Sequence, residues 1–347
     1  MSAENVTEYR PRFALVTGGA GFIGSHVVQT LLKEGVKVRV MVKPGEPTGN
    51  LDGLDIEQVE GDLLNPDSLR RALEGVDTLF HMAAIYAIWL PDPSLMYKVN
   101  VLGTISLFNI AKELGIEKVV YTSSVAAVGT GEGPVPSTEE TIFNNWLTAD
   151  HYIYSKYLSE NEAIKFNLKG LPVTAVNPVL PIGWGDIAPT PTGDLVMRYV
   201  SGKNPVWFPG GMNAANVRDV ARGHWLAALR GRPGERYILG GENITYKDFG
   251  FMVCRVAGVG EPKYEVKPGI IEFLGTINEW LSTNVTHKKP MFVNKGMKSI
   301  GGRYLYFDIS KAKRELGYDP GPLEGAVKEA VDWFKNGRDA ALAKGKK

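Results

Sequence analysis

A glycine-rich turn near the N-terminus restricts the fold of this 347-residue chain more than any other feature. The run "RFALVT" (12–17) is short, apolar and β-branched, and it leads straight into "GGAGFIGSHVV". Gly18, Gly21 and Gly24 follow one another at intervals of three, and the apolar residues after them have helical spacing. Glycines at such a point permit a tight turn and let a phosphate approach the backbone amides of the helix N-terminus. The succession of strand, turn and helix therefore predicts a dinucleotide-binding unit.

Strand-like and helix-like segments alternate after this unit. Short β-branched runs, typical of strands buried on both faces, occupy 36–42, 56–62, 77–83, 117–124, 172–178 and 235–241. Helical patterns occupy 22–34, 66–74, 94–115, 150–169, 219–230, 245–257, 268–282 and 323–336. The alternation predicts an α/β fold with a doubly wound parallel sheet. We expect residues 1–180 to form a Rossmann domain that binds the dinucleotide. Residues 181–347, with more Pro, Gly and Trp, should form mainly a smaller, mostly helical substrate lobe, with some segments returning to the first domain.

Composition argues against several classes of partner. Lys plus Arg number 39 and Asp plus Glu number 38, so the chain has no net charge to attract nucleic acid or an anionic membrane. No apolar run reaches the ~18 residues of a membrane span. The single cysteine, Cys254, excludes an internal disulfide and suits the reducing cytoplasm, where we expect the protein to act. The five histidines have no metal-ligand spacing, so we expect no metal site.

The second predicted strand ends in "VMVKPGEP", where a dinucleotide-binding sheet contacts the adenosine ribose. Sites that prefer NAD carry an acidic residue there to bind the ribose 2′-OH. In this chain Lys43 takes that position and Arg39 lies within the strand. Because a cation favours the 2′-phosphate, we predict NADP as cofactor, with NAD as the alternative. Asp62, at the end of the third strand, is expected to meet the adenine.

The segment "HYIYSKYLSE" (151–160) places three tyrosines around one lysine. On a helix, Tyr152 and Lys156 lie four residues apart on one face, whereas Tyr154 and Tyr157 face elsewhere. An ammonium beside a phenol favours the phenolate, so we expect the pKa of Tyr152 to be lowered from its usual value of about 10. Such a tyrosine can act as a general acid and base near neutral pH. The spacing alone also occurs in ordinary amphipathic helices.

Together these motifs resemble those of the extended short-chain dehydrogenase/reductases. The matching segments are "TGGAGFIG", "GDL" (61–63), "HMAA" (81–84), "NVLGT" (100–104), "YTSS" (121–124), Tyr152-x-x-x-Lys156, "NP" (177–178) and "NVRDVARGH" (216–224). The resemblance implies a catalytic set of Ser124, Tyr152 and Lys156, in which Lys156 also binds the nicotinamide ribose. It further implies that Asn100 orders the lysine and a water. The family's cofactor motifs correspond here to Gly18, Gly21, Phe22, Ile23, Gly24, Asp62, Leu63, Ala83, Ala84 and Pro178.

A closer likeness is to the dihydroflavonol-reductase-like branch, and it is carried by "VRVMVKP", "YTSSVAAVG", "PTPTG", "RYILGGEN" and "KAKRELGY". Bacterial members of this branch include hopanoid-associated proteins that are usually labelled sugar epimerases. Plant members of the wider branch reduce ketones with NADPH and usually have Arg where this chain has Lys43.

Three functions compete. The first is a carbonyl reductase or alcohol dehydrogenase, in which Tyr152 protonates the carbonyl oxygen as hydride arrives from the nicotinamide. The second is a nucleotide-sugar epimerase that keeps NAD(P) tightly bound. The Arg and Tyr usual in sugar epimerases are absent from "NPVLPIGWG", and the Asp-Glu pair of sugar dehydratases is absent after "YTSS". The third is a non-catalytic dinucleotide sensor, which the intact Ser–Tyr–Lys set disfavours.

Large apolar side chains near the expected site predict an apolar or aromatic aldehyde or ketone as substrate. They occur in "IYAIWLPDP" (85–93), "LPIGWGD" (180–186) and "VWFPGG" (206–211). The expected pocket residues are Tyr86, Trp89, Trp184 and Trp207, beside Ser124 and Tyr152. Arg218 and Arg222 could instead clamp a nucleotide diphosphate, which keeps the sugar alternative open.

The segments 94–115 and 150–169 are apolar on more than one face. One face must cover the sheet, and the other predicts a homodimer in which the same helices of two subunits pair. The alternative is a monomer whose second lobe covers the extra face.

Overall fold

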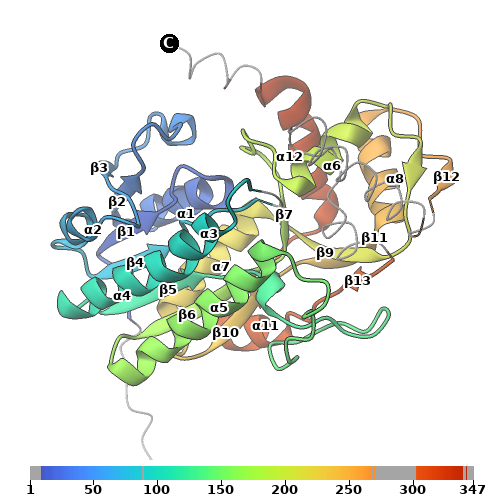
Figure 1. Ribbon diagram of the computed structural model, residues 1–347. Helices are drawn as coiled ribbons and strands as arrows, with labels where there is room; N and C mark the ends of the chain where they lie inside the picture. The colour runs from blue at the N-terminus through green and yellow to red at the C-terminus, as the bar shows by residue number, and fades with distance from the viewer. Residues whose placement is uncertain (1–8, 88–89, 267–268, 270–301, 339–340, 342–347) are drawn as a thin grey trace, which may run out of the picture.

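The computed structural model of the chain describes residues 9–87, 90–266, 269, 302–338 and 341. Its centre is a seven-stranded sheet in the order β10-β6-β5-β4-β1-β2-β3, and all neighbouring strands are parallel (Figure 1). The strands are β1 (Phe13–Thr17), β2 (Lys37–Val42), β3 (Glu57–Glu60), β4 (Thr78–His81), β5 (Lys118–Thr122), β6 (Val173–Pro178) and β10 (Arg236–Leu239). The strand order reverses between β1 and β4, where such sheets open a ligand crevice at their carboxyl ends. The predicted fold class is confirmed, and each predicted strand is present but shorter by one to three residues.

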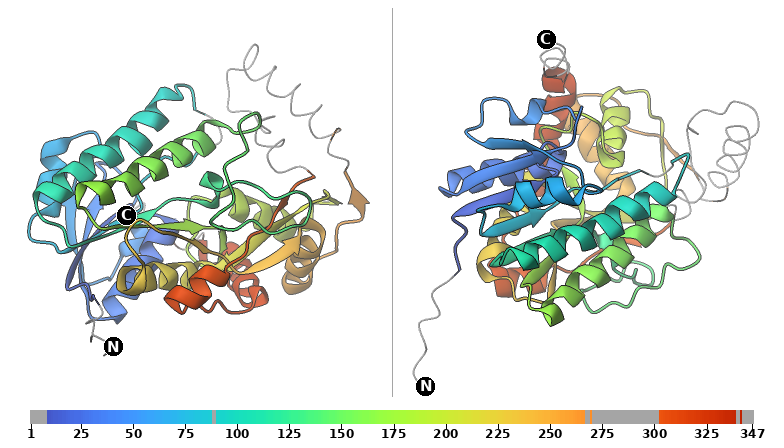
Figure 2. Two further views of the ribbon diagram at one scale, coloured as in Figure 1. Left: turned by 90° about the horizontal axis from the view of Figure 1, so that it is seen from below. Right: turned by 60° about the vertical axis from the view of Figure 1, so that its left-hand side comes forward.

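Helices cover both faces of this sheet. One face carries α1 (Phe22–Lys33), α7 (Val217–Arg230) and α11 (Ser310–Leu316). The opposite face carries α2 (Pro66–Leu73), α4 (Thr104–Glu113) and α5 (His151–Lys165), and Figure 2 shows α4 and α5 side by side across it. The inner strands β4, β5 and β6 are therefore buried on both faces, which explains why they are largely apolar without alternation, whereas the edge strand β3 is partly exposed.

Three of the predicted helices are less regular than their sequence pattern suggests. The 323–336 segment becomes π-helical over Trp333–Gly337. The 94–115 segment divides into α3 (Ser94–Tyr97), a π-helical segment (Lys98–Gly103) and α4. The 150–169 segment ends as a 3-10 turn, Phe166–Lys169, which Gly170 closes with φ of 86°. The predicted helix 268–282 lies, except for residue 269, outside the described residues.

A second lobe begins where β7 (Leu180–Ile182) follows β6 after one residue. In this lobe α6 (Pro191–Val200), α8 (Tyr246–Ala257) and α12 (Leu323–Asp332) pack around a small sheet of β7, β9 (Gly211–Asn216), β11 (Glu242–Thr245) and β13 (Tyr304–Leu305). A separate pair is formed by β8 (Val206–Trp207) and β12 (Tyr264–Glu265). The sequence analysis does not predict α6, α11 or these short strands. The strands have two to six residues, and segments this short carry little periodicity.

Three elements from the second half of the chain pack on the first sheet. β10 pairs with β6 at its edge, α7 packs against α1, and α11 lies on the same face. None of the helices in the part of the chain that the structure describes is long and apolar enough to cross a bilayer.

Candidate active site

The glycine-rich turn between β1 and α1 forms a backbone cradle. Gly18 has φ of 69°, in the left-handed region, and a Cβ there would lie 2.8 Å from the Ala83 backbone nitrogen. A Cβ on Gly24 would lie 2.1 Å from the Gly18 carbonyl oxygen. The N-terminus of α1 has no side-chain cap, so its first backbone N–H groups can bind an anion. The close backbone packing and the positive end of the helix dipole fit a pyrophosphate.

A buried hydrogen-bond chain joins the ends of β1 and β4 beside this turn. Thr17 Oγ1 accepts from the Ala83 backbone N–H at 3.2 Å and gives its own proton to Nδ1 of His81, 2.8 Å away. His81 Nε2 then donates to Thr104 Oγ1 at 2.9 Å, and that hydroxyl donates to the Asn100 carbonyl oxygen at 2.8 Å. Burial lowers the pKa of His81 to about 3, so the imidazole is neutral and supports the crevice wall rather than carrying charge.

Ser124, Tyr152 and Lys156 converge at the carboxyl end of β5. The helix α5 begins after Asp150, whose side chain accepts a backbone N–H of the first turn at 2.9 Å. This start puts Tyr152 in the first turn, where its hydroxyl lies near enough to the Ser124 side chain for Ser124 to lower its pKa. Lys156 follows one turn later, buried, with Nζ donating to the Thr122 carbonyl oxygen at 3.0 Å. The structure thus brings the three side chains together from the β5 loop and α5.

The pKa values in this set differ from the sequence-based prediction. Burial raises the pKa of Tyr152 to about 12, although the nearby Ser124 side chain lowers it in part. Burial lowers the pKa of Lys156 to about 8. The prediction that Lys156 lowers the pKa of Tyr152 was wrong for the protein without cofactor and substrate. The physical reason is that the ammonium points at the Thr122 carbonyl, and the loss of hydration around the phenol dominates.

The other two tyrosines of the segment have packing contacts. The Tyr154 hydroxyl donates to the Trp146 carbonyl oxygen. The Tyr157 ring stacks on Phe143 with centroids 4.4 Å apart. These contacts hold α5 against the loop that precedes it.

Tyr86 covers the Tyr152 ring from the loop after β4. The two ring centroids are 4.6 Å apart, and Tyr86 remains 52 % exposed. Tyr86 therefore lies against the Tyr152 ring, and its role as a wall of the substrate pocket stays a prediction.

The predicted pocket tryptophans have other partners. Trp184 packs on Trp333 with ring centroids 4.7 Å apart, and Trp207 lies beneath the Lys247 ammonium at 5.1 Å. The ring contacts of these two tryptophans in the described part of the chain do not include Tyr152. Trp89 lies outside the described residues.

Asn100 lies in the π-helical segment and joins two parts of the site. Its Nδ2 donates to the Ile85 carbonyl oxygen and to Ser155 Oγ, each at 3.0 Å, and its Oδ1 accepts from the Ile85 N–H at 2.7 Å. The side chain therefore fixes the loop that carries Tyr86 against α5. Its role in ordering Lys156 through a water stays a prediction.

The adenosine end of the predicted site contains an ion pair. Lys43 Nζ lies 3.4 Å from the Asp62 carboxylate, just beyond the ends of β2 and β3. Arg39 is directed elsewhere, because its Nε donates to Glu57 at 3.0 Å and its Nη1 donates to the Glu74 carbonyl oxygen at 2.7 Å. Arg39 is therefore removed from the predicted cofactor contacts: its mid-strand position directs it toward the end of α2.

The remaining predicted cofactor residues lie along the carboxyl edge of the sheet. They are Phe22 and Ile23 in the first turn of α1, Leu63 after β3, Ala84 after β4 and Pro178 at the end of β6.

Two buried polar residues beside the catalytic set, Glu160 and Asn177, are absent from the sequence-based prediction. Asn177 Nδ2 donates to the Ser124 carbonyl oxygen at 2.9 Å and also to the Glu160 carboxylate. The signal for Glu160 is its spacing of four from Lys156. The signal for Asn177 is that it is a polar residue at the end of a buried strand.

A glycine cradle at a helix N-terminus, with a Ser–Tyr–Lys set across the crevice, defines a short-chain dehydrogenase/reductase. Comparison with known proteins identifies the family, since the NAD dependent epimerase/dehydratase family matches residues 14–240. The chain therefore belongs to the NAD dependent epimerase/dehydratase family, as an oxidoreductase of the extended short-chain dehydrogenase/reductase type.

Relatives in this family include reductase-like members. A Synechocystis protein with the provisional name dihydroflavonol 4-reductase is 38 % identical over 330 residues, or 92 % of this chain and 94 % of its own. The "Sterol demethylase protein B" of Methylococcus capsulatus is 32 % identical over 321 residues, or 92 % of this chain and 98 % of its own.

Solved structures share the fold. The crystal structure of gox2253 has a TM-score of 0.83 at 41 % identity and covers 94 % of this chain and 99 % of its own. The dTDP-glucose 4,6-dehydratase DesIV of Streptomyces venezuelae, solved with NAD bound, has a TM-score of 0.76 at 25 % identity. The match covers 94 % of this chain and 98 % of the DesIV chain. The family thus holds both reductase-like and sugar-modifying members.

Proposed function

We propose that the chain is an NADP(H)-dependent reductase or dehydrogenase that moves hydride between the nicotinamide and an apolar or aromatic aldehyde or ketone. The observation that carries the proposal is the proximity of the Tyr152 and Ser124 side chains, with Lys156 one helical turn away and the Tyr86 ring against Tyr152. Two hydroxyls held together in this way can both bond one carbonyl oxygen, and the aromatic wall suits an apolar substrate. The reductase name of the Synechocystis relative supports the same activity.

The cofactor fits the residues present. The cradle at Gly18 and Gly24, with the uncapped start of α1, suits the pyrophosphate. We assign the adenosine end to Lys43 and Asp62 and the nicotinamide ribose to Lys156. When bound, the nicotinamide supplies or accepts the hydride.

Tyr152 acts as the acid in the direction of reduction. With a pKa of about 12 its hydroxyl is protonated at neutral pH and can donate to the substrate carbonyl oxygen. As negative charge develops on that oxygen, the Tyr152 proton moves to it and the Ser124 hydroxyl donates a second hydrogen bond. We assign the stabilisation of the phenolate left on Tyr152 to Lys156, whose ammonium would have to turn from the Thr122 carbonyl oxygen to act on it. In the direction of oxidation the Tyr152 phenolate accepts the proton of the alcohol hydroxyl.

Carbonyl reduction is expected to slow as the pH rises through about 8, the pKa to which burial lowers Lys156. Below that pH the ammonium is present and stabilises the Tyr152 phenolate; above it the charge is lost. Tyr152 itself stays protonated on both sides, since its pKa is about 12. Initial rates of NADPH oxidation across this pH range should therefore follow the protonated fraction of Lys156. A profile that stays level on both sides of the lysine pKa would contradict this role.

The position of Lys43 supports a preference for NADP over NAD. The side chain is well exposed and lies 3.4 Å from Asp62, so a 2′-phosphate can share its charge. Lys43→Glu is expected to weaken NADPH binding by ~1–3 kcal/mol, the range for a lost charged hydrogen bond. NADH lacks the 2′-phosphate and serves as the matched control ligand, whose binding should change little. Fluorescence titration with both cofactors measures the difference, and equal affinities in the parent protein would refute the preference.

The arginines that could clamp a nucleotide diphosphate are held by carboxylates. Arg218 lies 3.4 Å from Glu329, and Arg222 lies 2.7 Å from Glu34. Both arginines are exposed, as Lys43 is, so these ion pairs do not decide between an apolar carbonyl and a nucleotide sugar. Relatives named for sterol and 3-beta-hydroxysteroid chemistry support the apolar carbonyl.

The deciding assay follows NADPH absorbance with a panel of hydrophobic aldehydes and ketones, alongside binding of UDP- and dTDP-sugars. We expect at least one apolar carbonyl to oxidise NADPH. Saturable UDP-sugar binding without oxidation by any carbonyl would overturn the proposal and support the epimerase alternative. Cofactor binding with neither NADPH oxidation nor sugar binding would support the non-catalytic dinucleotide sensor.

We also propose a two-fold dimer through the 94–115 and 150–169 segments. Leu102 and Leu158 lie on these neighbouring segments and are 59 % and 43 % exposed. Exposed leucines on paired helices suit a self-complementary interface. Light scattering at micromolar concentration should give the mass of a dimer for the parent and of a monomer for Leu158→Glu. A monomer mass for the parent would refute the dimer.

A further inference from the structure

A carboxylate without a role in the proposed reaction lies one helical turn beyond Lys156. Glu160 is only 3 % exposed. One of its oxygens lies 2.8 Å from Arg236 Nη1, and the other accepts from Asn177 Nδ2. These donors, one of them a cation, stabilise the negative charge of the buried carboxylate. We call Glu160, Asn177 and Arg236 the carboxylate brace.

Asn177 fixes Glu160 relative to Ser124. It is fully buried at the end of β6, and its amide nitrogen also donates to the Ser124 carbonyl oxygen at 2.9 Å. Both neighbours are acceptors, so the reversed amide would place its oxygen against two other oxygens. The two N–H groups of one amide therefore join the Ser124 backbone to the Glu160 carboxylate.

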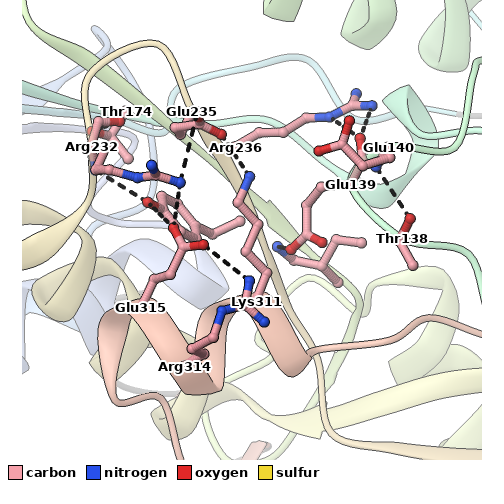
Figure 3. A network of polar contacts seen from close by, with 12 residues as sticks. Thr138, Glu139, Glu140, Thr174, Arg232, Glu235, Arg236, Lys311, Arg314 and Glu315 are labelled. Atoms are coloured by element: carbon pink, nitrogen blue, oxygen red, sulfur yellow. Dashed lines mark hydrogen bonds and ion pairs between the residues drawn. The ribbon is translucent and has the colours of Figure 1, made fainter.

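Arg236 anchors the other side of Glu160. Figure 3 shows its guanidinium reaching from β10 to the segment of Glu139, where Nε donates to the Glu139 carbonyl oxygen at 2.9 Å. The Glu139 carboxylate in turn accepts from the Ile238 backbone N–H at 2.9 Å, on the same strand. The brace thus links α5, β6 and β10, and its geometry is set by the packing of three elements.

The groups around Lys156 Nζ are otherwise neutral near pH 7. Burial lowers the pKa of His81 to about 3 and raises that of Tyr152 to about 12. The Tyr121 ring lies 5.6 Å from Nζ, and burial raises the pKa of its hydroxyl as well. Among the described residues, Glu160 is the charged group that acts on Lys156, and it raises the lysine pKa against the opposing effect of burial.

We propose that Glu160 is a positioning residue for the reaction: the carboxylate brace holds its negative charge one helical turn from Lys156 and so keeps the lysine cationic. The link to turnover rests on the proposed function, whereas the effect on the charge of Lys156 does not. Without the Glu160 charge, burial acts unopposed and Lys156 loses its proton at a lower pH.

The protonation of Lys156 can be measured without any substrate. Competitive acetylation of the full-length protein with acetic anhydride over a pH series, followed by mass spectrometry of the peptide that holds Lys156, gives its titration midpoint. In Glu160→Gln, which keeps the shape but not the charge, this midpoint is expected to fall by ~1 unit. Glu160→Asp keeps the charge and should shift it less. The matched control is Glu162→Gln on the same helix, whose carboxylate pairs with Lys165 at 2.7 Å and should not affect Lys156.

Kinetics give a second measurement. Relative to the parent, Glu160→Gln is expected to reduce carbonyls ~5-fold more slowly near pH 8 and to recover at lower pH, where Lys156 is protonated again. A purely structural role would instead slow the reaction at every pH. If Glu160→Gln does not fold, Glu160→Gln/Arg236→Gln removes the ion pair as a unit and leaves no unpaired buried charge. Its midpoint should also fall.

An unchanged Lys156 midpoint in either folded variant would overturn the proposal. A lowered midpoint in a protein that turns over no carbonyl would support the brace and count against the proposed function alone. The effect of the brace on Lys156 and the proposed reductase function can therefore be refuted independently.

Discussion

The Tyr152→Phe protein is expected to reduce carbonyl substrates at least ~10²-fold more slowly than the parent, the lower range for the loss of a general acid. The substitution removes the hydroxyl that lies near Ser124 and that we propose gives its proton to the substrate oxygen. The ring remains, so its contact with Tyr86 at 4.6 Å is kept and the fold should not change. NADPH affinity should be unchanged as well, because the assigned cofactor contacts do not use this hydroxyl. Rates of NADPH oxidation and a fluorescence titration measure the two effects.

Tyr154→Phe is the matched control for this variant. It removes a hydroxyl two residues away on the same helix, one that donates to the Trp146 carbonyl oxygen. Turnover should stay close to that of the parent. Full activity in Tyr152→Phe, or an equal loss in Tyr154→Phe, would contradict the assignment of Tyr152 as the acid.

Gly18→Ala is expected to weaken NADPH binding by at least ~10²-fold, as for the loss of two charged hydrogen bonds of about 1.5 kcal/mol each. Gly18 has φ of 69°, and a new Cβ would lie 2.8 Å from the Ala83 nitrogen and 2.9 Å from the Ala83 Cα. Both contacts are with backbone, so the turn itself must move. The backbone amides at the start of α1 would then no longer face the pyrophosphate. Isothermal titration with NADPH measures the loss.

Gly35→Ala separates this clash from backbone strain. Gly35 has φ of 78°, close to that of Gly18, but a Cβ there meets nothing within 4 Å. It should therefore cost only the strain of a left-handed residue, about 1–2 kcal/mol of unfolding free energy, with NADPH affinity unchanged. Thermal melts and titrations of both variants test the comparison. Parental affinity in Gly18→Ala, or an equal loss in Gly35→Ala, would show that the turn is not the phosphate site.

Most strands of the main sheet could be predicted because they are continuous apolar runs, and burial on both faces requires that pattern; the edge strand β3, with the sequence EQVE, is the exception. The sites at their carboxyl ends could be located in turn, since a parallel sheet brings those ends to one edge. The second lobe was harder to predict. Its strands are short, and Trp184 and Trp207 have the composition of a pocket wall, whereas the structure packs them against Trp333 and Lys247.

Local spacing in the sequence determined the glycine cradle and the shared face of Tyr152 and Lys156, because both depend on residues within one or two turns of each other. The tertiary structure alone decided their electrostatics. The pKa of Tyr152 rises to about 12 and that of Lys156 falls to about 8 because the folded chain removes water from both, which no local pattern reports. The link from Glu160 through Asn177 to Ser124 likewise depends on how α5 packs against β5 and β6, which are far apart in the sequence.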